Sequence, residues 1–431
     1  MPVIETNKNE TNGAVDYAAL NYRWNFGVLT LEAVAFLSCF AFFDPTIILP
    51  LLLKNLHASN MQIGFFRVIA VLGYSLPALF SAHYIHGKPR HKRFLVNTCG
   101  GARLALLTIP ISLVLFARQY PTAVILWLAF VYFIYFTLDG ACAVSWYDIL
   151  GKAIPSRVRG RFFGVMQTLG GAGAMGAGLG TAFILNSHSI TYPMNYAMLA
   201  AIWCLGAGIS QIGLSLIREP EGTVDLEDAK PPITDFLRGA IPMLRSNKQL
   251  ARIIFTRILI DGAGLAAPFY VLYARRDLHV SLAVCGVYIT VQSLGRVVTG
   301  PLWGWISDHY GTGAGIRCIA FCAMLIPATA VLTKVFGSPL MPLVFFFMGA
   351  VQDGVWMVVS NAMIDAASPE ERPLAVGVGS VLLLPGVLYG PLGGLLAQEF
   401  PYHIVFITGV CFGAAGILAS LTLKTRRASV T

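Results

Sequence analysis

Long apolar stretches alternate with short polar ones along almost the whole chain. A run of about 20 apolar residues is long enough to cross the hydrocarbon core of a bilayer as a helix. Twelve runs reach about this length, so the pattern predicts an all-α polytopic membrane protein with twelve transmembrane helices. The expected spans are 25–53, 62–86, 94–117, 122–149, 161–185, 192–217, 251–273, 282–306, 316–336, 340–366, 374–397 and 403–423.

The longest polar stretch lies in the middle of the chain and divides the spans into two sets of six. Within it, apolar residues after Pro231-Pro232 recur at helical spacing among basic ones, which predicts an amphipathic helix on the membrane surface. The expected organisation is a cytoplasmic tail at 1–24, a six-helix bundle at 25–217, a cytoplasmic linker at 218–250, a second six-helix bundle at 251–423 and a cytoplasmic tail at 424–431.

One polar motif occurs in both sets of spans. Asp139-Gly140 lies in the fourth span and Asp353-Gly354 in the tenth, and each aspartate precedes a proline, Pro155 or Pro369, by 16 positions. In both copies an apolar helix with one acid is followed by a polar turn and then by a glycine-rich helix. The chain is therefore expected to consist of two similar halves.

Composition excludes an ordinary soluble protein. Hydrophobic residues make up 56% of the chain and charged residues 12%, whereas about 25% of residues in soluble domains are charged. The eight cysteines fall in or beside apolar stretches and lack the spacing of metal ligands. We therefore expect no cofactor and no bound metal.

The distribution of basic residues predicts the orientation. Twenty-one lysines and arginines fall on the side that carries both termini and five on the other side, namely Lys54, Arg118, Arg275, Arg276 and Lys334. Because basic loops are retained in the cytoplasm, both termini are expected there, with the protein in the plasma (inner) membrane. The net charge of +9 then reflects loops that face anionic lipid headgroups, and no nucleic-acid partner is expected.

The loop between the eighth and ninth spans reads Gly304-Trp305-Ile306-Ser307-Asp308-His309-Tyr310-Gly311. Together with the six-plus-six arrangement, it resembles the G-x-L-a-D-r-x-G-r-r signature of the major facilitator superfamily of secondary transporters. The resemblance implies two pseudo-symmetric six-helix bundles and alternating access. It also implies a gating latch between Asp308 and Arg372, and the gating residues would be Asp308, Gly304, Gly311, Arg159 and Arg372.

The corresponding loop of the first half is different. It keeps basic residues but has no acid, and none occurs anywhere between Asp44 and Asp139. A first-half latch of the usual kind is therefore not expected. The histidines of this loop, His83, His86 and His91, are expected to be solvated, and Asp148 and Asp365 are expected to cap or pair at the ends of their spans.

Glycines in the eleventh span form a second resemblance. The stretch Gly386-Val387-Leu388-Tyr389-Gly390-Pro391-Leu392-Gly393-Gly394 is similar to a sequence that drug/proton antiporters of the superfamily carry in span 5. Glycines four residues apart allow helix backbones to approach closely in lipid. A packing role is the expected one here.

Charged residues inside the spans are the candidates for binding solute or protons. A charge in the middle of a bilayer is costly, so such residues usually face the interior, pair or bind cargo. By the resemblance, spans 1, 4, 7 and 10 line a central cavity. The candidates are Glu32, Asp44, Arg67, Asp139, Arg257, Asp261, Arg296 and Asp353, with Trp356 as a possible contact for the solute.

Several of these charges have a structural alternative. For four of the acids the alternative to binding solute or protons is a structural ion pair: Asp139 with Arg103, Asp261 with Arg257, Asp353 with Arg296 and Asp44 with Arg67. Glu32 lies near the cytoplasmic end of its span, and its alternative is to extend its side chain toward that membrane surface. Asp44 precedes Pro45, which breaks the helix locally and leaves carbonyl groups beside a carboxylate. Asp44 is therefore the preferred proton-binding residue.

These observations favour a secondary active transporter that moves a small solute by alternating access. Proton coupling is expected, with export preferred to uptake, and the protein is expected to act as a monomer. The alternatives are an uptake symporter for a sugar or organic anion, a non-transporting receptor and an intramembrane enzyme. No catalytic motif is present and no Walker loop, so neither an enzyme nor coupling to ATP is favoured.

Overall fold

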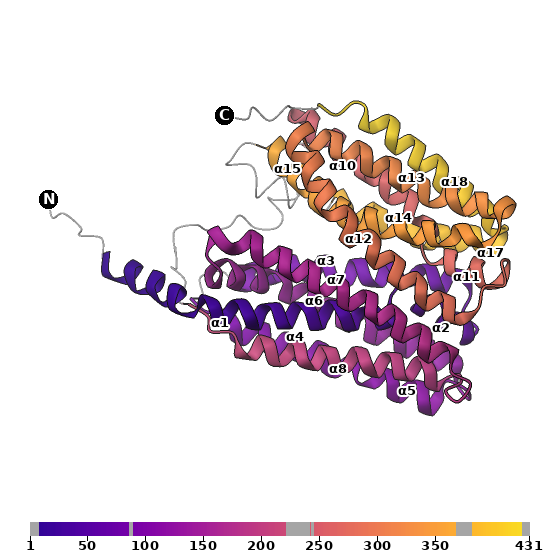
Figure 1. Cartoon of the computed structure of the whole chain (residues 1–431), viewed down its shortest axis with the longest axis horizontal. Helices are drawn as coiled ribbons and strands as arrows, with labels where there is room; N and C mark the ends of the chain where they lie inside the picture. Colours follow the sequence, from indigo (N-terminus) through magenta and orange to yellow (C-terminus); the bar gives the residue numbers. More distant parts are fainter. Residues whose placement is uncertain (1–7, 86–88, 221–241, 243–244, 368–381, 425–431) are drawn as a thin grey trace.

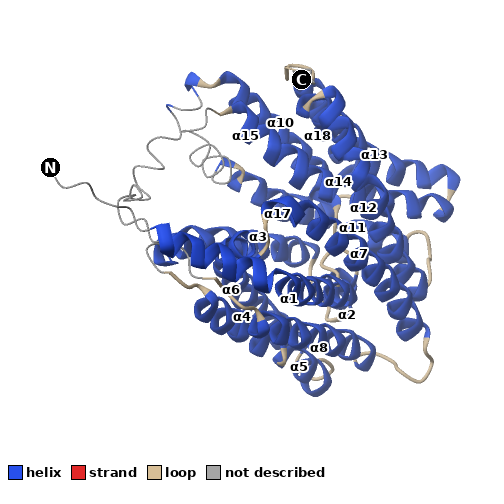
Figure 2. Cartoon of the chain, turned by 60° about the vertical axis from the view of Figure 1, so that its left-hand side comes forward, coloured by secondary structure: helices blue, strands red, loops and turns tan. Residues whose placement is uncertain are grey.

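The computed structural model describes residues 8–85, 89–220, 242, 245–367 and 382–424, and every regular element in them is a helix (Figures 1 and 2). The first half contains α1 (Lys8–Phe40), η1 (Ala41–Phe43), α2 (Ile48–Asn55), α3 (Asn60–Ile85), α4 (Lys92–Leu106), α5 (Thr108–Phe116), α6 (Pro121–Ala153), α7 (Ser156–Asn186) and α8 (Met194–Leu216).

The second half begins in the same way as the first, with a long helix, a 3-10 turn and a short helix. Its elements are α10 (Lys248–Ala263), η2 (Gly264–Ala266), α11 (Phe269–Arg276), α12 (Leu282–Tyr310), α13 (Thr312–Phe336), η3 (Ser338–Leu340), α14 (Met341–Gly354), η4 (Val355–Val359), α15 (Ser360–Ala366), η5 (Leu384–Leu388), α17 (Tyr389–Glu399) and α18 (Tyr402–Ser420). The predicted amphipathic helix of the linker lies outside the described residues.

Nine helical segments of the described chain are long and apolar enough to cross a membrane. The other three expected spans coincide with α3, with α10 to α11, and with η5 and α17, although the start of the last lies outside the described residues. Large apolar side chains such as Phe183 and Val335 are 78% exposed, as expected for surfaces that face lipid. The chain is a multi-pass integral membrane protein.

Helix α1 extends beyond the expected first span. That span was expected to begin at position 25, and α1 already begins at Lys8, within the residues expected to form the cytoplasmic tail. No proline interrupts the chain between Pro2 and Pro45, so nothing in the backbone stops the helix before the membrane is reached.

The first span of each half is broken near its end. In the first half the helix stops at Asp44-Pro45 and resumes as α2. In the second half, α10 ends in the 3-10 turn η2, and α11 begins after Pro268. The break predicted at Asp44 is confirmed, and the short helices α2 and α11 are equivalent parts of the two halves.

The halves meet at one end of the molecule and diverge at the other (Figure 1). We call the end where α1 and α10 begin the linker end, and the end that carries α2 and α11 the distal end. The halves are joined mainly by α3 with α17 and by α7 with α12, and α2 also contacts α11. A Cβ atom on Gly64 of α3 would lie 2.1 Å from the carbonyl oxygen of Gly390 in α17, so this crossing requires glycine. The expected packing role of the span-11 glycines is confirmed at this crossing.

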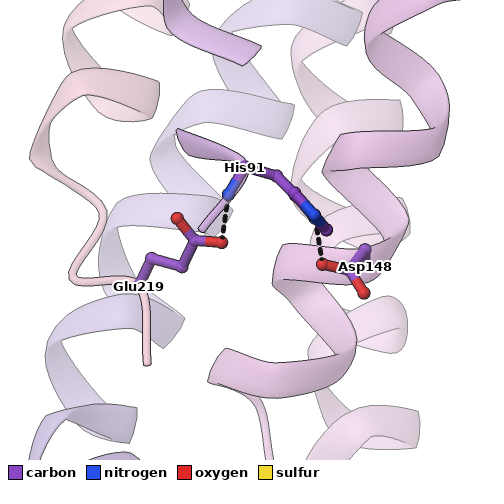
Figure 3. Close-up of side chains that lie close together, drawn as sticks. All are labelled: His91, Asp148 and Glu219. Atoms are coloured by element: carbon purple, nitrogen blue, oxygen red, sulfur yellow. Dashed lines mark hydrogen bonds and ion pairs between the residues drawn. The ribbon is translucent and has the colours of Figure 1, made fainter. Parts of the chain in front are cut away.

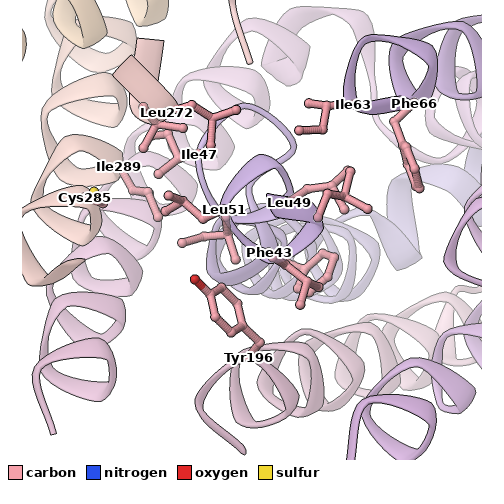
Figure 4. Close-up of a cluster of buried hydrophobic side chains, with 14 of the residues drawn as sticks. Phe43, Ile47, Leu49, Leu51, Ile63, Phe66, Tyr196, Leu272, Cys285 and Ile289 are labelled. Carbon is pink, nitrogen blue, oxygen red and sulfur yellow. The ribbon is translucent and has the colours of Figure 1, made fainter. Parts of the chain in front are cut away.

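Buried apolar side chains form three clusters. The largest joins both halves at the distal end and includes Ile47 of the first half with Leu272 and Cys285 of the second (Figure 4). The other two clusters each belong to a single half: one contains Leu29 and the other Trp303. One apolar core therefore seals the distal end, whereas no described cluster spans the halves elsewhere.

Candidate functional site

A cavity of about 290 Å³ lies between the halves, and we call it the inter-half cavity. Residues of α7, including Gln167 and Thr168, line its first-half side. Arg296 of α12, Asp353 of α14 and Trp356 of η4 line its second-half side. The structure thus brings three of the predicted site residues together at the interface of the two bundles.

Arg296 and Asp353 do not form an ion pair. Arg296 donates through Nη2 to the side-chain oxygen of Gln352, and its Nε is buried without a partner. Asp353 lies close enough to be attracted by Arg296, yet its carboxylate has no hydrogen bond among the described residues. Both groups therefore keep free capacity to bind a solute or a proton inside the cavity.

A second cavity, of about 240 Å³, lies within the first half. We call it the first-half cavity, and its lining includes Glu32, Arg103, Asp139 and Trp146. Leu37 lines both this cavity and the inter-half cavity, so the two are adjacent. Two predicted carboxylates are therefore placed beside the central interface.

Glu32 does not extend toward the membrane surface but is buried in a polar network. Its Oε1 accepts a hydrogen bond from Ser210 Oγ at 2.9 Å, and its Oε2 accepts one from Trp146 Nε1 at 3.1 Å. Arg103 donates to the same Ser210 oxygen at 2.7 Å and to the side chain of Gln211.

The expected ion pair of Arg103 with Asp139 is not formed. Asp139 has no hydrogen bond among the described residues, because Arg103 is engaged by α8. The sequence interpretation missed Ser210 and Gln211, although two consecutive polar residues within an apolar span were a detectable signal. Asp139 is thus a lining carboxylate without a structural partner in the described chain.

Asp44, the preferred proton-binding residue, has a clear structural role. Its Oδ1 accepts hydrogen bonds from Thr46 N at 2.7 Å, Thr46 Oγ1 at 2.6 Å and Ile47 N at 3.0 Å. This arrangement satisfies backbone donors at the start of α2. The alternative pair with Arg67 is not formed, because Arg67 of α3 reaches across to the second half and donates to the Gly264 carbonyl at 3.0 Å.

Arg257 and Asp261 form the expected internal ion pair on one face of α10. Arg257 Nε lies 2.8 Å from Asp261 Oδ2. Arg257 also lines a small cavity that shares Trp356 with the inter-half cavity. Asp261 is therefore neutralised locally, while Arg257 lines a cavity next to the inter-half cavity.

The glycine of each repeated Asp-Gly motif permits a close helix contact. A Cβ on Gly140 would lie 2.0 Å from the Tyr74 carbonyl of α3, and one on Gly354 would lie 2.7 Å from Trp303 Nε1 of α12. In both halves the glycine packs against the neighbouring helix while the preceding aspartate lines a cavity. The motif thus fixes a carboxylate beside a tight helix crossing.

The predicted gating residues are only partly described. Gly311 has φ 84° and connects α12 to α13, a conformation that glycine adopts readily. Arg159 donates to the carbonyls of Gly151 and Ile154 at the end of α6. Asp308 is exposed and has no ion pair among the described residues, and Arg372 lies outside them.

Gly304, next to this loop, has no atom within 4 Å of the place where its Cβ would lie. Glycine is therefore not required there for packing.

The expectation of solvated loop histidines was wrong for His91. It is buried, and its Nδ1 lies 2.6 Å from Asp148 Oδ2 at the end of α6 (Figure 3). Lys152 binds the same carboxylate oxygen at 2.6 Å. Asp148 therefore pairs at the end of its span as expected, but with a histidine from the first-half loop.

Glu219, just after α8, completes this cluster. It accepts a hydrogen bond from the backbone N–H of His91 at 2.8 Å (Figure 3), and another from that of Lys92 at 2.9 Å, at the start of α4. The ligand-type atoms of His91, Asp148 and Glu219 lie within 4.8 Å of one another, but they are engaged in these bonds and Lys152 adds a positive charge. The cluster is a structural clamp, and it supplies the acids that the first-half loop lacks.

Two pseudo-symmetric six-span halves around a central cavity define the class of polytopic membrane carriers. The model of the Major Facilitator Superfamily matches residues 254–431. The hexose-6-phosphate:phosphate antiporter of Escherichia coli strain K12 is 27% identical over 301 residues, which cover 66% of this chain and 63% of that protein. Human solute carrier family 67 member A1 is 26% identical over 155 residues, covering 35% and 36% of the two chains.

Solved structures match over almost the whole chain. The D-xylose-proton symporter has a TM-score of 0.68 at 14% identity, covering 93% of this chain and 99% of its own. A variant of the nucleoside transporter NupG has a TM-score of 0.70 at 14% identity, covering 91% and 98%. The chain therefore shares the fold of these transporters over almost its whole length.

Proposed function

We propose that the protein is a secondary active transporter that moves a small solute by alternating access. The observation that carries this proposal is the unequal sealing of the two ends: one apolar core joins the halves at the distal end, while separate cores serve each half elsewhere. The inter-half cavity lies between them with unsatisfied charged groups. Such a molecule exposes its site to one side at a time.

We place the linker end on the cytoplasmic side of the plasma (inner) membrane, with both termini in the cytoplasm. The excess of basic residues on that side supports this orientation. The structure then corresponds to an inward-open state. Residues 25–217 and 251–423 would move as two bodies within one monomer.

Proton coupling is the second part of the proposal, with export of the solute preferred to uptake. Asp139 and Asp353 line cavities and have no hydrogen bonds among the described residues, so each can take up a proton without breaking an existing pair. Asp44 would lose its capping bonds on protonation of Oδ1, and Asp261 its ion pair. Asp353, beside the solute path, is therefore the stronger candidate.

The test is transport by the purified protein in liposomes. A panel of sugars, organic anions and amphiphilic cations is offered under an imposed proton gradient, a sodium gradient or none. We expect accumulation of one class only with the proton gradient. Solute movement that is indifferent to both gradients would contradict coupling to protons or sodium.

Exchange of a phosphate-bearing organic anion is a second candidate. It is favoured by the relative that exchanges hexose 6-phosphate for phosphate and by Arg296, whose buried Nε has no partner in the inter-half cavity. Guanidinium groups bind phosphate with strong, charge-assisted hydrogen bonds. Liposomes loaded with phosphate would then take up labelled sugar phosphate without any proton gradient, which separates this candidate from the first.

A further inference from the structure

A third cavity, of about 250 Å³, lies at the distal end between the halves. We call it the distal cavity. Lys54 of α2 lines it from the first half, and Arg275 and Arg276 of α11 line it from the second. No acidic side chain lines it. These three are among only five basic residues on the side of the chain opposite the termini, so their convergence in one cavity is not explained by a general excess of positive charge.

The distal cavity is built by equivalent segments of the two halves. The chain reads Lys54-Asn55-Leu56-His57-Ala58-Ser59 from the end of α2 onward and Arg276-Asp277-Leu278-His279-Val280-Ser281 from the end of α11 onward. The two histidines have positive φ, 64° and 52°, and the two serines each accept a hydrogen bond from a backbone N–H of the following helix. Lys54 and Arg276 therefore occupy the same position in the two repeats.

The basic side chains retain free donors. Arg276 binds Asp277 through Nε and Nη2 and lies over the Tyr402 ring at 4.4 Å, but its Nη1 has no partner among the described residues. Lys54 donates one hydrogen bond to Asn60, and Arg275 uses Nη1 for the Val280 carbonyl. Asp277 offsets the charge of Arg276, so two of the three positive charges of Lys54, Arg275 and Arg276 remain without an acidic partner among the described residues.

Closure of the distal end therefore holds like charges near one another. Lys54 belongs to one half and Arg276 to the other, and their charges repel. A small anion between them would remove this repulsion and accept hydrogen bonds from both halves. Tyr196, whose hydroxyl points toward Leu51 of α2 in Figure 4, and Asn55 add neutral polar groups to the wall.

We propose that the distal cavity binds a phosphate group, which bridges Lys54 and Arg276 and holds the distal end closed. The phosphate group belongs to a free anion or to a lipid headgroup. Binding itself does not depend on the proposed transport; only the effect on closure rests on alternating access.

Binding is tested with the full chain in dodecyl maltoside, a non-ionic detergent without a phosphate group. Sodium phosphate is titrated by calorimetry at constant ionic strength, with sodium chloride as the reference. We expect Lys54→Gln and Arg276→Gln each to weaken phosphate binding by about tenfold, as for loss of one charge-assisted contact. Lys334→Gln, an exposed basic residue on the same side that does not line the cavity, is the matched control and should bind as the unmodified protein does.

Phosphatidylglycerol nanodiscs distinguish the two sources of phosphate. The lipid headgroup is identified as the occupant if phosphatidylglycerol weakens the binding of inorganic phosphate in the unmodified protein and in Lys334→Gln but not in the two cavity variants. Equal affinity in detergent and in phosphatidylglycerol nanodiscs identifies the free anion. Phosphate binding that is absent in detergent, or that survives both Lys54→Gln and Arg276→Gln unchanged, overturns the site.

Closure is tested at Ile47, which is fully buried in the shared core but does not line the distal cavity. In Ile47→Cys, labelling by a membrane-impermeant maleimide is followed by mass spectrometry of the peptide that contains this position. A tenfold excess of phosphate over its Kd should slow labelling about tenfold, and Lys54→Gln should abolish the effect. Unchanged labelling despite measured binding would overturn the role in closure and leave transport by the protein unaffected.

Discussion

His91 Nδ1 lies 2.6 Å from Asp148 Oδ2 and ties the start of α4 to the end of α6. The counterpart of Asp148 at the end of α15, Asp365, is exposed and has no ion pair among the described residues. The two halves therefore hold their linker ends together in different ways.

Asp148→Asn should destabilise the protein, because both His91 and Lys152 lose a charged partner. About 1 kcal/mol is expected, since the Asp148 side chain is 34% exposed and its interactions are partly screened. Thermal unfolding in detergent measures the change. Asp365→Asn is the matched control; if it costs as much as Asp148→Asn, the clamp does not stabilise the first half.

Asp44→Asn and Asp44→Ala separate capping from proton binding. Asparagine keeps an acceptor for Thr46 and Ile47, so it should fold as well as the unmodified protein, whereas alanine should cost about 0.5–2 kcal/mol. If Asp44 only caps α2, Asp44→Asn also retains proton-driven accumulation. Loss of accumulation in this folded variant would restore Asp44 as the proton-binding residue.

Asp353→Asn should uncouple transport from the proton gradient. An amide cannot take up a proton, so accumulation in liposomes should fall to the level reached without a gradient while downhill exchange persists. Asp365→Asn, an exposed acid in the same half, should leave coupling intact. Normal accumulation in Asp353→Asn would show that another carboxylate carries the proton, and Asp139→Asn is then the next variant to measure.

Gly64→Ala should force α3 away from α17. The new Cβ would meet the Gly390 carbonyl oxygen at 2.1 Å, and overpacking of this kind costs about 1–3 kcal/mol. The distal end should therefore open more often, and Ile47→Cys should be labelled faster in this background. Gly176→Ala is the control, because no atom lies within 4 Å of its Cβ position. Equal labelling in the two backgrounds would show that the crossing does not hold the end closed.

Asp308→Asn should weaken closure of the linker end if Asp308 and Arg372 form a latch. Labelling of Thr168→Cys, which lines the inter-half cavity, should then increase. Arg93→Gln, an exposed substitution in the equivalent first-half loop, should have a smaller effect. If labelling is the same in Asp308→Asn as in the unmodified protein, the latch implied by the resemblance must be withdrawn.

The sequence was sufficient for the fold because each span has to be apolar along its length, and the break at Asp44-Pro45 follows from the missing proline N–H. Side-chain partners were harder to predict. Arg103 is bound by Ser210 and Gln211, more than a hundred positions away, and not by the nearer Asp139. Hydropathy identifies a membrane-spanning helix but does not tell how the helix is rotated about its own axis, which decides the side chains that meet on neighbouring helices.

The same limit explains why one loop residue was misread. His91 looked like one of several solvated histidines, yet Glu219 binds the backbone beside it from the end of α8. The burial of His91 depends on how α4, α6 and α8 pack together at the linker end, and no local sequence pattern predicts that packing. The repeat around His57 and His279 was readable but is too short to be noticed without knowing that α2 and α11 are equivalent.

The shared distal core has a kinetic consequence. When this end opens, the cluster around Ile47 and Leu272 is divided and its apolar surface meets water, at about 25 cal/mol for each Å². A bound solute offsets this cost through contacts that differ between the two states, but the empty protein has no such compensation. Under the proposed alternating access, we expect return of the empty protein to be the slowest step of the cycle, and exchange of one solute molecule for another, which avoids that step, to be faster than net flux.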